Sequence, residues 1–316
     1  MLRIRLVPEQ TAINFIRMRM FAFMFSATLV IASFGLFFTQ GLNLGIDFLG
    51  GVLVEVKTKG PADIADLRDR VGGLDIGEVA LQEFGAPDDV LIRIQRQDGG
   101  EQAQQAAVNS VKQALGDQVA EYRRIEFVGP TVGAELQESA TWAVLAAVGA
   151  ILLYIWFRFE WQFGVGATVA LTHDVLTTIG LFSLLQLEFN LATVAAVLTI
   201  AGYSINDTVV IFDRVRENLR RYKRMPLAEL CNLSINETLS RTAMTSFTTL
   251  LALFALYLFG GEVIRGFSIA LIWGIVIGTF STIWVAVPIL LYLNPDNSAL
   301  AGTDEESCEG ASPGRG

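Results

Sequence analysis

The sequence has few cysteines and almost no histidine. Its 316 residues include two cysteines, Cys231 and Cys308, and one histidine, His173. Two cysteines cannot form the disulfide framework of a small secreted domain, and one histidine offers no ligand group for a transition metal. We find no nucleophile beside a general base and no nucleotide-binding glycine loop. The sequence therefore predicts a protein that is not an enzyme and that holds no metal or cofactor.

Charged residues are scarce as well. They make up 17% of the chain, against 52% hydrophobic residues, and the mean hydropathy is +0.48. The net charge of −9 comes from acidic residues concentrated in 40–137 and 294–316. Such segments are typical of solubilising surfaces, so we expect no nucleic-acid partner.

Long apolar runs dominate the rest of the sequence. A membrane-spanning helix needs about 20 apolar residues, whereas the strands of a membrane barrel are about half as long and alternate. Six runs are long enough and nearly free of charge, which predicts a polytopic α-helical membrane protein with six transmembrane helices. The runs are 20–46, 139–157, 161–187, 189–212, 242–261 and 266–294.

Basic residues predict which way these helices face. They gather in 1–19, at Arg158 and in 213–224, and six spans place all three segments on one side, so both termini are expected in the cytoplasm. The first run is longer than the apolar region of a cleaved signal peptide, so we expect it to remain as a span. The predicted parts are a cytoplasmic N-terminus (1–19), a first transmembrane helix (20–39), an external domain with hinges (40–137), a five-helix region (138–293) containing a cytoplasmic loop (213–240), and a disordered acidic tail (294–316).

The external segment has a different pattern from the rest. Alternating strand-like and helical patterns follow in the order βαββαβ, which is the split-βαβ or ferredoxin-like arrangement. We therefore predict an α+β domain between the first and second transmembrane helices, used either to contact another chain or as a spacer. The expected elements are strands at 51–57, 76–84, 90–95 and 119–128, and helices at 61–71 and 101–115.

Two glycine-containing motifs bracket this domain. Gly45-Ile-Asp-Phe-Leu-Gly-Gly51 precedes its first strand, and Val128-Gly-Pro-Thr-Val-Gly133 follows its last. Glycine permits positive φ and close backbone approach, and proline restricts a linker. The motifs are either plain turns or a hinge between the domain and the membrane. The candidate hinge residues are Gly45, Asp47, Gly50, Gly51, Gly129, Pro130 and Gly133.

Few ionisable residues lie within the apolar runs, where each costs roughly 2.5–3.5 kcal/mol. Asp207 lies in the fourth run, and Arg241 enters the fifth at a similar depth. If these helices are neighbours, Arg241 moving toward or away from Asp207 would switch the carboxyl between proton release and uptake. The alternative is a static buried ion pair. Supporting polar groups are Ser204, Asn206, Thr208, Thr245 and Ser246, of which the last two could carry a water chain or bond back to their own helix.

A second polar pair lies near the middle of the third run. His173 and Asp174 are adjacent, so their side chains point about 100° apart on a helix. One of them could join a proton relay while the other bonds a neighbouring helix, or the pair could be purely structural.

Residues from about 15 to 293 resemble the SecD/SecF family of bacterial protein-export subunits, and in particular the smaller of its two membrane subunits. The block 202–218 is the most specific part of the resemblance. The other matching segments are the two glycine motifs, 173–175 and 240–246.

The resemblance implies a function that composition cannot show. Members of the family belong with transporters of the resistance-nodulation-division type, and the smaller subunit pairs with SecD in the bacterial cytoplasmic (inner) membrane. The pair works beside the SecYEG channel, with YajC and YidC as associates, and uses the proton motive force to help export polypeptides. The external domains are expected to contact the emerging polypeptide. The proton-linked Asp and Arg of the family fall on Asp207 and Arg241.

Two other functions remain open from the residues alone. One is half of an independent proton-coupled exporter of lipids or drugs, which would need a second copy or a partner chain. The other is a structural membrane assembly factor, in which the buried charges only hold helices together.

Overall fold

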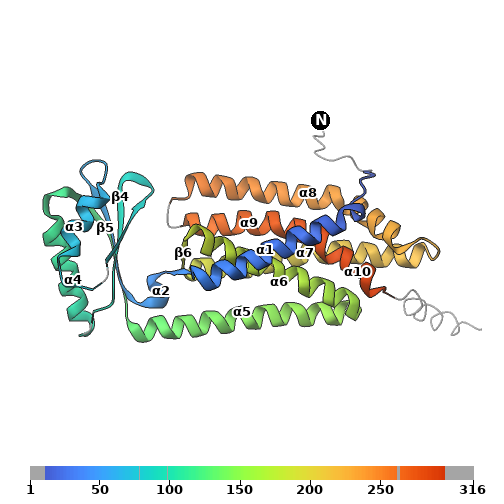
Figure 1. The fold of residues 1–316 in the computed structure, drawn as a ribbon, viewed down its shortest axis with the longest axis horizontal. Helices are drawn as coiled ribbons and strands as arrows, with labels where there is room; N and C mark the ends of the chain where they lie inside the picture. The colour runs from blue at the N-terminus through green and yellow to red at the C-terminus, as the bar shows by residue number, and fades with distance from the viewer. Residues whose placement is uncertain (1–10, 78, 98, 262–263, 296–316) are drawn as a thin grey trace, which may run out of the picture.

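The structure is a computed structural model that describes residues 11–77, 79–97, 99–261 and 264–295. A four-stranded sheet with two helices lies at one end of the molecule, and a bundle of long helices forms the rest (Figure 1). Residues 1–10 of the predicted N-terminal segment and 296–316 of the predicted acidic tail lie outside the described residues.

Six helices in the described part are long and apolar enough to cross a membrane, in agreement with the prediction. The last begins as α9 and continues through a π-helical segment, Thr282–Ala286, into α10. The helices are α1 (Arg19–Thr39), α5 (Pro130–Arg158), α6 (Trp161–Leu185), α7 (Leu191–Arg221), α8 (Leu227–Phe259), and α9 (Arg265–Ser281) with α10 (Val287–Leu293).

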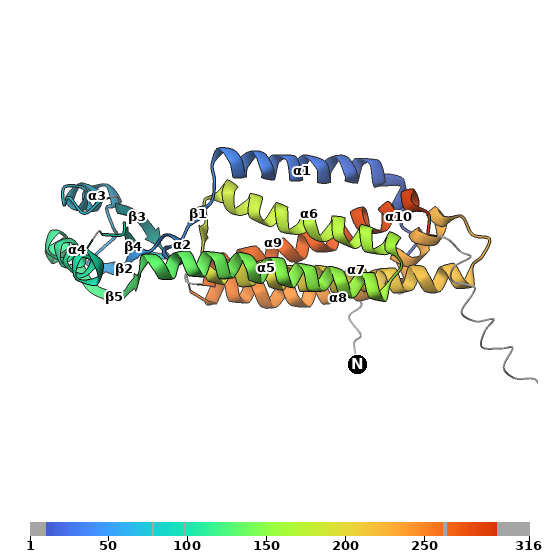
Figure 2. The ribbon, with the colours of Figure 1, turned by 90° about the horizontal axis from the view of Figure 1, so that it is seen from below.

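Three of these helices form the centre of the bundle. In their most apolar windows, 50% of the residues of α6, 50% of α7 and 67% of the last helix are buried, against 11% in α1, 6% in α5 and 17% in α8. Figure 2 shows α1 and α8 along opposite sides of the bundle. The apolar side chains of the outer helices therefore face away from the protein core, toward lipid or a partner.

Small residues let the helices approach closely. A Cβ atom on Gly180 of α6 would collide with Ser33 of α1, and one on Gly274 of α9 would collide with Ile200 of α7. Membrane helices gain their packing energy from such close contacts, because lipid chains are as apolar as the side chains themselves. These glycines set how tightly α1 and α9 pack on their neighbours.

The sheet domain has the βαββαβ element order. Its strands are antiparallel and lie in the order β3-β4-β2-β5. Both helices cover one face, where Val54 of the central strand packs with Leu67 and Val111. The elements are β2 (Gly51–Thr58), α3 (Ile64–Gly72), β3 (Val79–Phe84), β4 (Ala86–Ile94), α4 (Gly100–Leu115) and β5 (Val119–Val128).

Three boundaries differ from the predictions for local reasons. The helix expected to begin at 61 begins at Ile64. The Asp63 side chain accepts hydrogen bonds from the Ala65 and Asp66 amides and so caps the helix there. The turn expected at 85–89 shortens to Gly85, whose φ is +88°, and the following residues enter β4 beside a bulge. Residues 130–137, expected in the external domain, form the start of α5.

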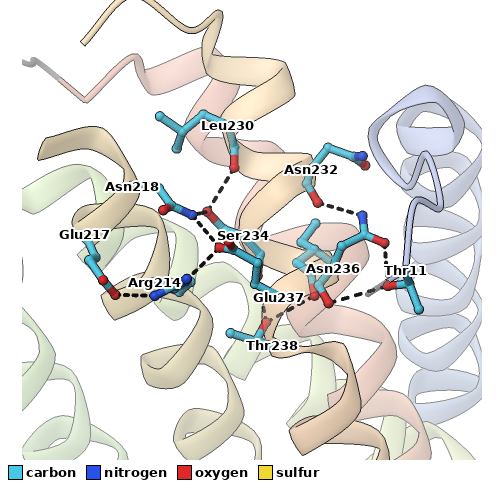
Figure 3. A network of polar contacts seen from close by, with 11 residues as sticks. Thr11, Arg214, Glu217, Asn218, Leu230, Asn232, Ser234, Asn236, Glu237 and Thr238 are labelled. Atoms are coloured by element: carbon cyan, nitrogen blue, oxygen red, sulfur yellow. Dashed lines mark hydrogen bonds and ion pairs between the residues drawn. The ribbon is translucent and has the colours of Figure 1, made fainter. Parts of the chain in front are cut away.

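The segment 213–240, which connects the fourth and fifth apolar runs, is a helical hairpin. α7 runs on to Arg221 and α8 begins at Leu227, which leaves only 222–226 between them. The two arms are joined by polar side chains (Figure 3): Arg214 binds Glu237 at 2.7 Å, and Asn218 donates to Glu237 at 2.8 Å and to Ser234 at 3.0 Å. Such charge-assisted bonds between α7 and α8 hold the two polar helix ends together beyond the apolar bundle.

The beginning of the described chain packs on the second arm of this hairpin. The Asn236 side chain accepts a hydrogen bond from the Thr11 hydroxyl at 2.7 Å (Figure 3). It accepts a second from the Ile13 amide at 3.0 Å. The Asn232 side chain accepts one from the Phe15 amide at 2.8 Å. Two asparagines thus satisfy the backbone amides that precede α1, where no helical partner exists for them.

We expect Gly180→Leu to separate α1 from α6, because a side chain there overlaps Ser33. The free energy of unfolding of the Gly180→Leu variant should be lower than that of the unchanged protein by about 2 kcal/mol or more. The matched control is Gly149→Leu on α5, where no neighbouring atom lies within 4 Å of the added Cβ. Thermal unfolding in detergent measures both, and equal midpoints for the two variants would show that the α1–α6 contact is not tight.

Candidate functional site

The most connected polar group in the bundle is the carboxylate of Asp174 on α6. Its side chain is 0% exposed. One oxygen, Oδ2, accepts hydrogen bonds from the hydroxyls of Ser204 on α7 at 2.6 Å and Ser281 on α9 at 2.8 Å. A single carboxylate therefore links the three central helices, through charge-assisted bonds that are stronger than bonds between neutral groups.

The other oxygen of Asp174 binds the adjacent residue. Oδ1 accepts a hydrogen bond from His173 Nδ1 at 2.9 Å, in the tautomer with the proton on Nδ1. The sequence left open whether the two side chains would serve different helices, and here they meet each other. His173 is 4% exposed, and its Nε2 has no hydrogen-bond partner among the described residues. The imidazole is thus oriented by the carboxylate and keeps one buried acceptor open.

Asp207 lies on α7 three residues after Ser204, so the two share one face of the helix. Its side chain is 4% exposed, and Oδ2 is buried with no hydrogen-bond partner among the described residues. Asp174 accepts three hydrogen bonds from side chains, whereas the Asp207 carboxyl accepts none from the described residues. The two buried carboxyl groups therefore differ sharply in their surroundings.

Arg241 occupies the neighbouring helix α8, close enough to act electrostatically on Asp207. Its side chain is exposed, and no ion pair or hydrogen bond joins it to Asp207 within the part of the chain that the structure describes. The helices that carry Asp207 and Arg241 are thus neighbours, but the two charged groups do not touch.

The supporting polar residues divide into two groups. Thr208 pairs with Thr282 at 2.9 Å and Ser246 with Thr279 at 2.8 Å, so both reach the last helix. The Thr245 hydroxyl bonds back to carbonyls of its own helix, and Asn206 is exposed. Of the two hydroxyl residues predicted on α8, only Ser246 bonds another helix among the described contacts.

Sequence reasoning missed three residues of the last helix. Ser281, Thr282 and Thr279 each bond a polar group on α6, α7 or α8. The only signal in the sequence is their clustering within an otherwise apolar run. A lone hydroxyl in such a run usually bonds to its own helix, so the pattern by itself does not identify a site.

The two glycine motifs pack against each other. Gly50 and Gly51 have φ values of +70° and +122°, and a Cβ on Gly51 would lie 2.5 Å from the Ile94 carbonyl oxygen. A Cβ on Gly133, in the first turn of α5, would lie 3.0 Å from the Phe48 carbonyl oxygen in the short helix α2 (Ile46–Leu49). Gly129 is the cap residue before α5, and Pro130 is the first residue of that helix.

The first motif is also attached to the start of α7. β1 (Asn43–Leu44) pairs in parallel with β6 (Glu188–Phe189), just before that helix. The Asp47 side chain accepts a hydrogen bond from the Leu191 amide at 3.0 Å, which places a carboxylate at the helix N-terminus. A Cβ on Gly45 would meet the Glu188 side chain at 2.7 Å. The same helix that carries Asp207 thus begins against the predicted hinge.

The sheet binds the same point from the other side. Arg93 on β4 donates to Glu188 at 2.5 Å and to the Asn43 side chain at 3.1 Å. A groove of about 500 Å³ adjoins this contact, with Ile46, Leu53 and Leu91 among its apolar residues. The sheet domain is therefore joined to the segment before α7 by an arginine, beside an open groove.

Comparison with known proteins gives consistent matches. Residues 107–296 match the family model for the C-terminal region of the protein export membrane proteins SecD and SecF, and residues 35–62 match the SecD/SecF GG motif. The protein translocase subunit SecF of Rhodobacter capsulatus is 48% identical over 310 residues, covering 94% of this chain and 93% of that protein. The subunit of the same name from Magnetococcus marinus is 48% identical over 305 residues, covering 95% and 98%.

A solved structure shares the fold. The crystal structure of SecDF, a translocon-associated membrane protein from Thermus thermophilus, matches with a TM-score of 0.83 and 35% identity over 92% of this chain. A second SecDF structure, in a super-membrane-facing form, matches with a TM-score of 0.67 and 34% identity over 95% of the chain. This chain spans 40% and 41% of the two solved chains.

We expect Ser281→Ala to lower the free energy of unfolding by about 1.5–3 kcal/mol, because it removes a hydrogen bond to a buried charge. Thr248→Ala is the control, since that hydroxyl bonds only to carbonyls of its own helix, and it should change little. In an Asp174→Asn background the effect of Ser281→Ala should shrink. An unchanged effect in that background would contradict the assigned pairing.

We expect Arg93→Ala to loosen the contact between sheet and bundle, because the Glu188 carboxylate then loses its partner. Amide hydrogen exchange in 43–49 and 188–191 should become about tenfold faster or more. The control is Arg70→Ala, whose ion pair with Asp66 lies within α3. Equal protection of these segments in both variants would show that Arg93 does not hold the two parts together.

Proposed function

The chain belongs to the SecD/SecF family of protein-export membrane proteins, and on this premise we propose that it couples proton movement through the helix bundle to the export of polypeptides. The observation that carries the proposal is Asp207, a buried carboxyl group on a membrane helix with no hydrogen-bond or ion-pair partner among the described residues. Ionisable groups at such positions are costly, and they commonly mark ion or proton pathways.

The proposed proton step uses Asp207 and Arg241. Removal from water disfavours the charged form of any carboxyl group, and a nearby guanidinium favours it. With Arg241 apart, as the two residues lie here, Asp207 takes up a proton. When Arg241 approaches, the charged form is favoured and the proton leaves. A small relative shift of α7 and α8 would therefore be enough to alternate between the two states.

Asp174 and His173 are the secondary candidates for the relay. Both oxygens of Asp174 already accept hydrogen bonds, which suits an anchor that holds α6, α7 and α9 in place. Ser204, which donates to Asp174, lies on the same face of α7 as Asp207. We propose that this anchor gives α7 a fixed reference against which the Asp207–Arg241 pair moves.

Movement would reach the sheet domain through α7. The N-terminus of this helix is bound by Asp47, and the connection before it is bound by Arg93 through Glu188. We propose that a shift of α7 is passed to the glycine motifs at Gly50 and Gly133, which act as the hinge. Hinges need a few residues that absorb changes in dihedral angle, and glycine does so at low cost.

The proposed orientation follows the positive-inside rule. Arg158 and the basic end of α7 lie at the end of the bundle opposite the sheet (Figure 1). We place that end in the cytoplasm together with both termini, and the ferredoxin-like domain outside the membrane. There the groove beside Ile46 and Leu91 is a candidate contact for an emerging polypeptide.

The proposed partner within the membrane is SecD. The solved SecDF chains that share this fold are more than twice as long as the part matched here. The outer helices α5 and α8 have few buried residues, so they offer wide apolar faces for a second subunit. The family resemblance adds the SecYEG channel, YajC and YidC as further associates.

We expect Asp207→Asn to abolish proton-dependent export while the protein remains in the membrane, because the amide cannot carry a proton between two states. Preprotein export should fall at least tenfold in cells that depend on this chain, a size typical of lost proton transfer. Asp213→Asn, six residues further along α7, is the matched control and should export normally. Membrane levels of each variant are checked by immunoblot.

The double variant Asp207→Asn/Arg241→Gln separates the proposal from a structural role. If the two charges serve only helix packing, removing both leaves no lone charge, so a packing role predicts recovery of export. A proton relay predicts that the double variant stays inactive. Normal export by the double variant would therefore overturn the proposed proton step, leaving an assembly role.

A further inference from the structure

A charged groove lies between the end of α5 and the last turns of α7, at the end of the bundle opposite the sheet. It encloses about 430 Å³. Four of its six lining residues are arginines and two are acidic, so it carries a surplus of positive charge. The lining residues are Arg158, Asp213, Arg216, Glu217, Arg220 and Arg221.

Both carboxylates of the groove are already engaged. Asp213 binds Arg158 at 3.1 Å, and Glu217 binds Arg214, which lies outside the lining, at 2.6 Å (Figure 3). The charges of Arg158 and Asp213 therefore offset each other. Glu217 is paired with Arg214, so Arg216, Arg220 and Arg221 form no ion pair with a described residue of the groove.

Arg216 and Arg220 form no ion pair among the described residues. The Arg216 Nε atom is buried and has no hydrogen-bond partner there, and its Nη1 makes only a long contact of 3.4 Å with the Arg158 carbonyl oxygen. A buried donor without an acceptor is costly, because it has lost its water. The groove thus presents guanidinium groups that lack an anion.

Exposed aromatic residues next to Arg158 favour a position of the groove at the level of the lipid headgroups. Phe157 is 90% exposed, and Trp156 and Trp161 are each 55% exposed, so large exposed aromatic residues precede and follow Arg158 in the chain. Outward-facing tryptophans mark the membrane interface. Asp213 and Arg221 are about 12 Å apart along α7, and the headgroup layer is about 5–8 Å thick on each side. A phosphate of that layer can reach the groove.

We propose that this groove binds the phosphate of an anionic phospholipid headgroup, with Arg216 and Arg220 as its main donors. The planar guanidinium fork matches phosphate oxygens in pairs, and basic pockets between membrane helices suit anionic headgroups. A lipid fits better than an acidic protein, because the exposed aromatic residues Trp156, Phe157 and Trp161 lie close in the chain to Arg158, which lines the groove. This inference does not depend on the proposed proton step.

Native mass spectrometry of the full chain in detergent tests the proposal. We expect phosphatidylglycerol to be retained at about tenfold lower concentration than phosphatidylcholine with the same acyl chains. Arg216→Gln/Arg220→Gln should lose this preference. The control Lys223→Gln/Arg224→Gln removes the same charge from exposed residues outside the groove, and should keep it.

The other outcomes overturn the proposal. Equal loss of preference in the two double variants would mean general surface charge, and no loss in either would place the lipid elsewhere. Displacement of phosphatidylglycerol by inorganic phosphate would mean a small-anion site. Binding of a poly-glutamate peptide without any lipid preference would mean a protein partner. If the groove variant unfolds at a lower temperature, Arg220→Gln alone, at an exposed position, replaces it with the same expected loss.

Discussion

A carboxylate placed among membrane helices must find hydrogen-bond donors there, because lipid supplies none. Asp174 meets this requirement with donors from its own helix and from α7 and α9. The same three helices form the buried centre of the bundle, and the outer helices pack around them. The positions of α6, α7 and α9 therefore depend on one charge and the hydroxyls that surround it.

Asp207, on the neighbouring helix α7, has the opposite surroundings. Its carboxyl group is equally buried but has no partner among the described residues, and Arg241 stands near without contact. A well-satisfied charge fixes a structure, whereas an unsatisfied one favours a change of protonation or of position. A carboxylate with several donors at Asp174 and a carboxyl group without a partner at Asp207 are the two features on which the proposed proton step depends.

α7 connects every functional part of the molecule. Its start is held by Asp47, its middle carries Ser204 and Asp207, and its basic end lines the groove proposed to bind lipid. A helix of this kind transmits displacement along its axis, because its backbone hydrogen bonds make it stiff. One stiff helix thereby carries Asp207, contacts the Asp174 carboxylate and the segment that leads into the sheet domain, and lines the groove proposed to bind lipid.

The six spans, the βαββαβ order, the glycine motifs and the family resemblance could all be read from the sequence. Each depends on local composition, spacing or motif identity, which a chain carries whatever its tertiary contacts. Only the tertiary structure decided that His173 and Asp174 bond each other, that Ser281 joins them, and that 227–240 packs against 213–221. It also decided that Asp207 and Arg241 are neighbours without an ion pair. These features depend on which helices adjoin and how each is rotated about its axis, and apolar runs that are hydrophobic on all sides do not encode that rotation.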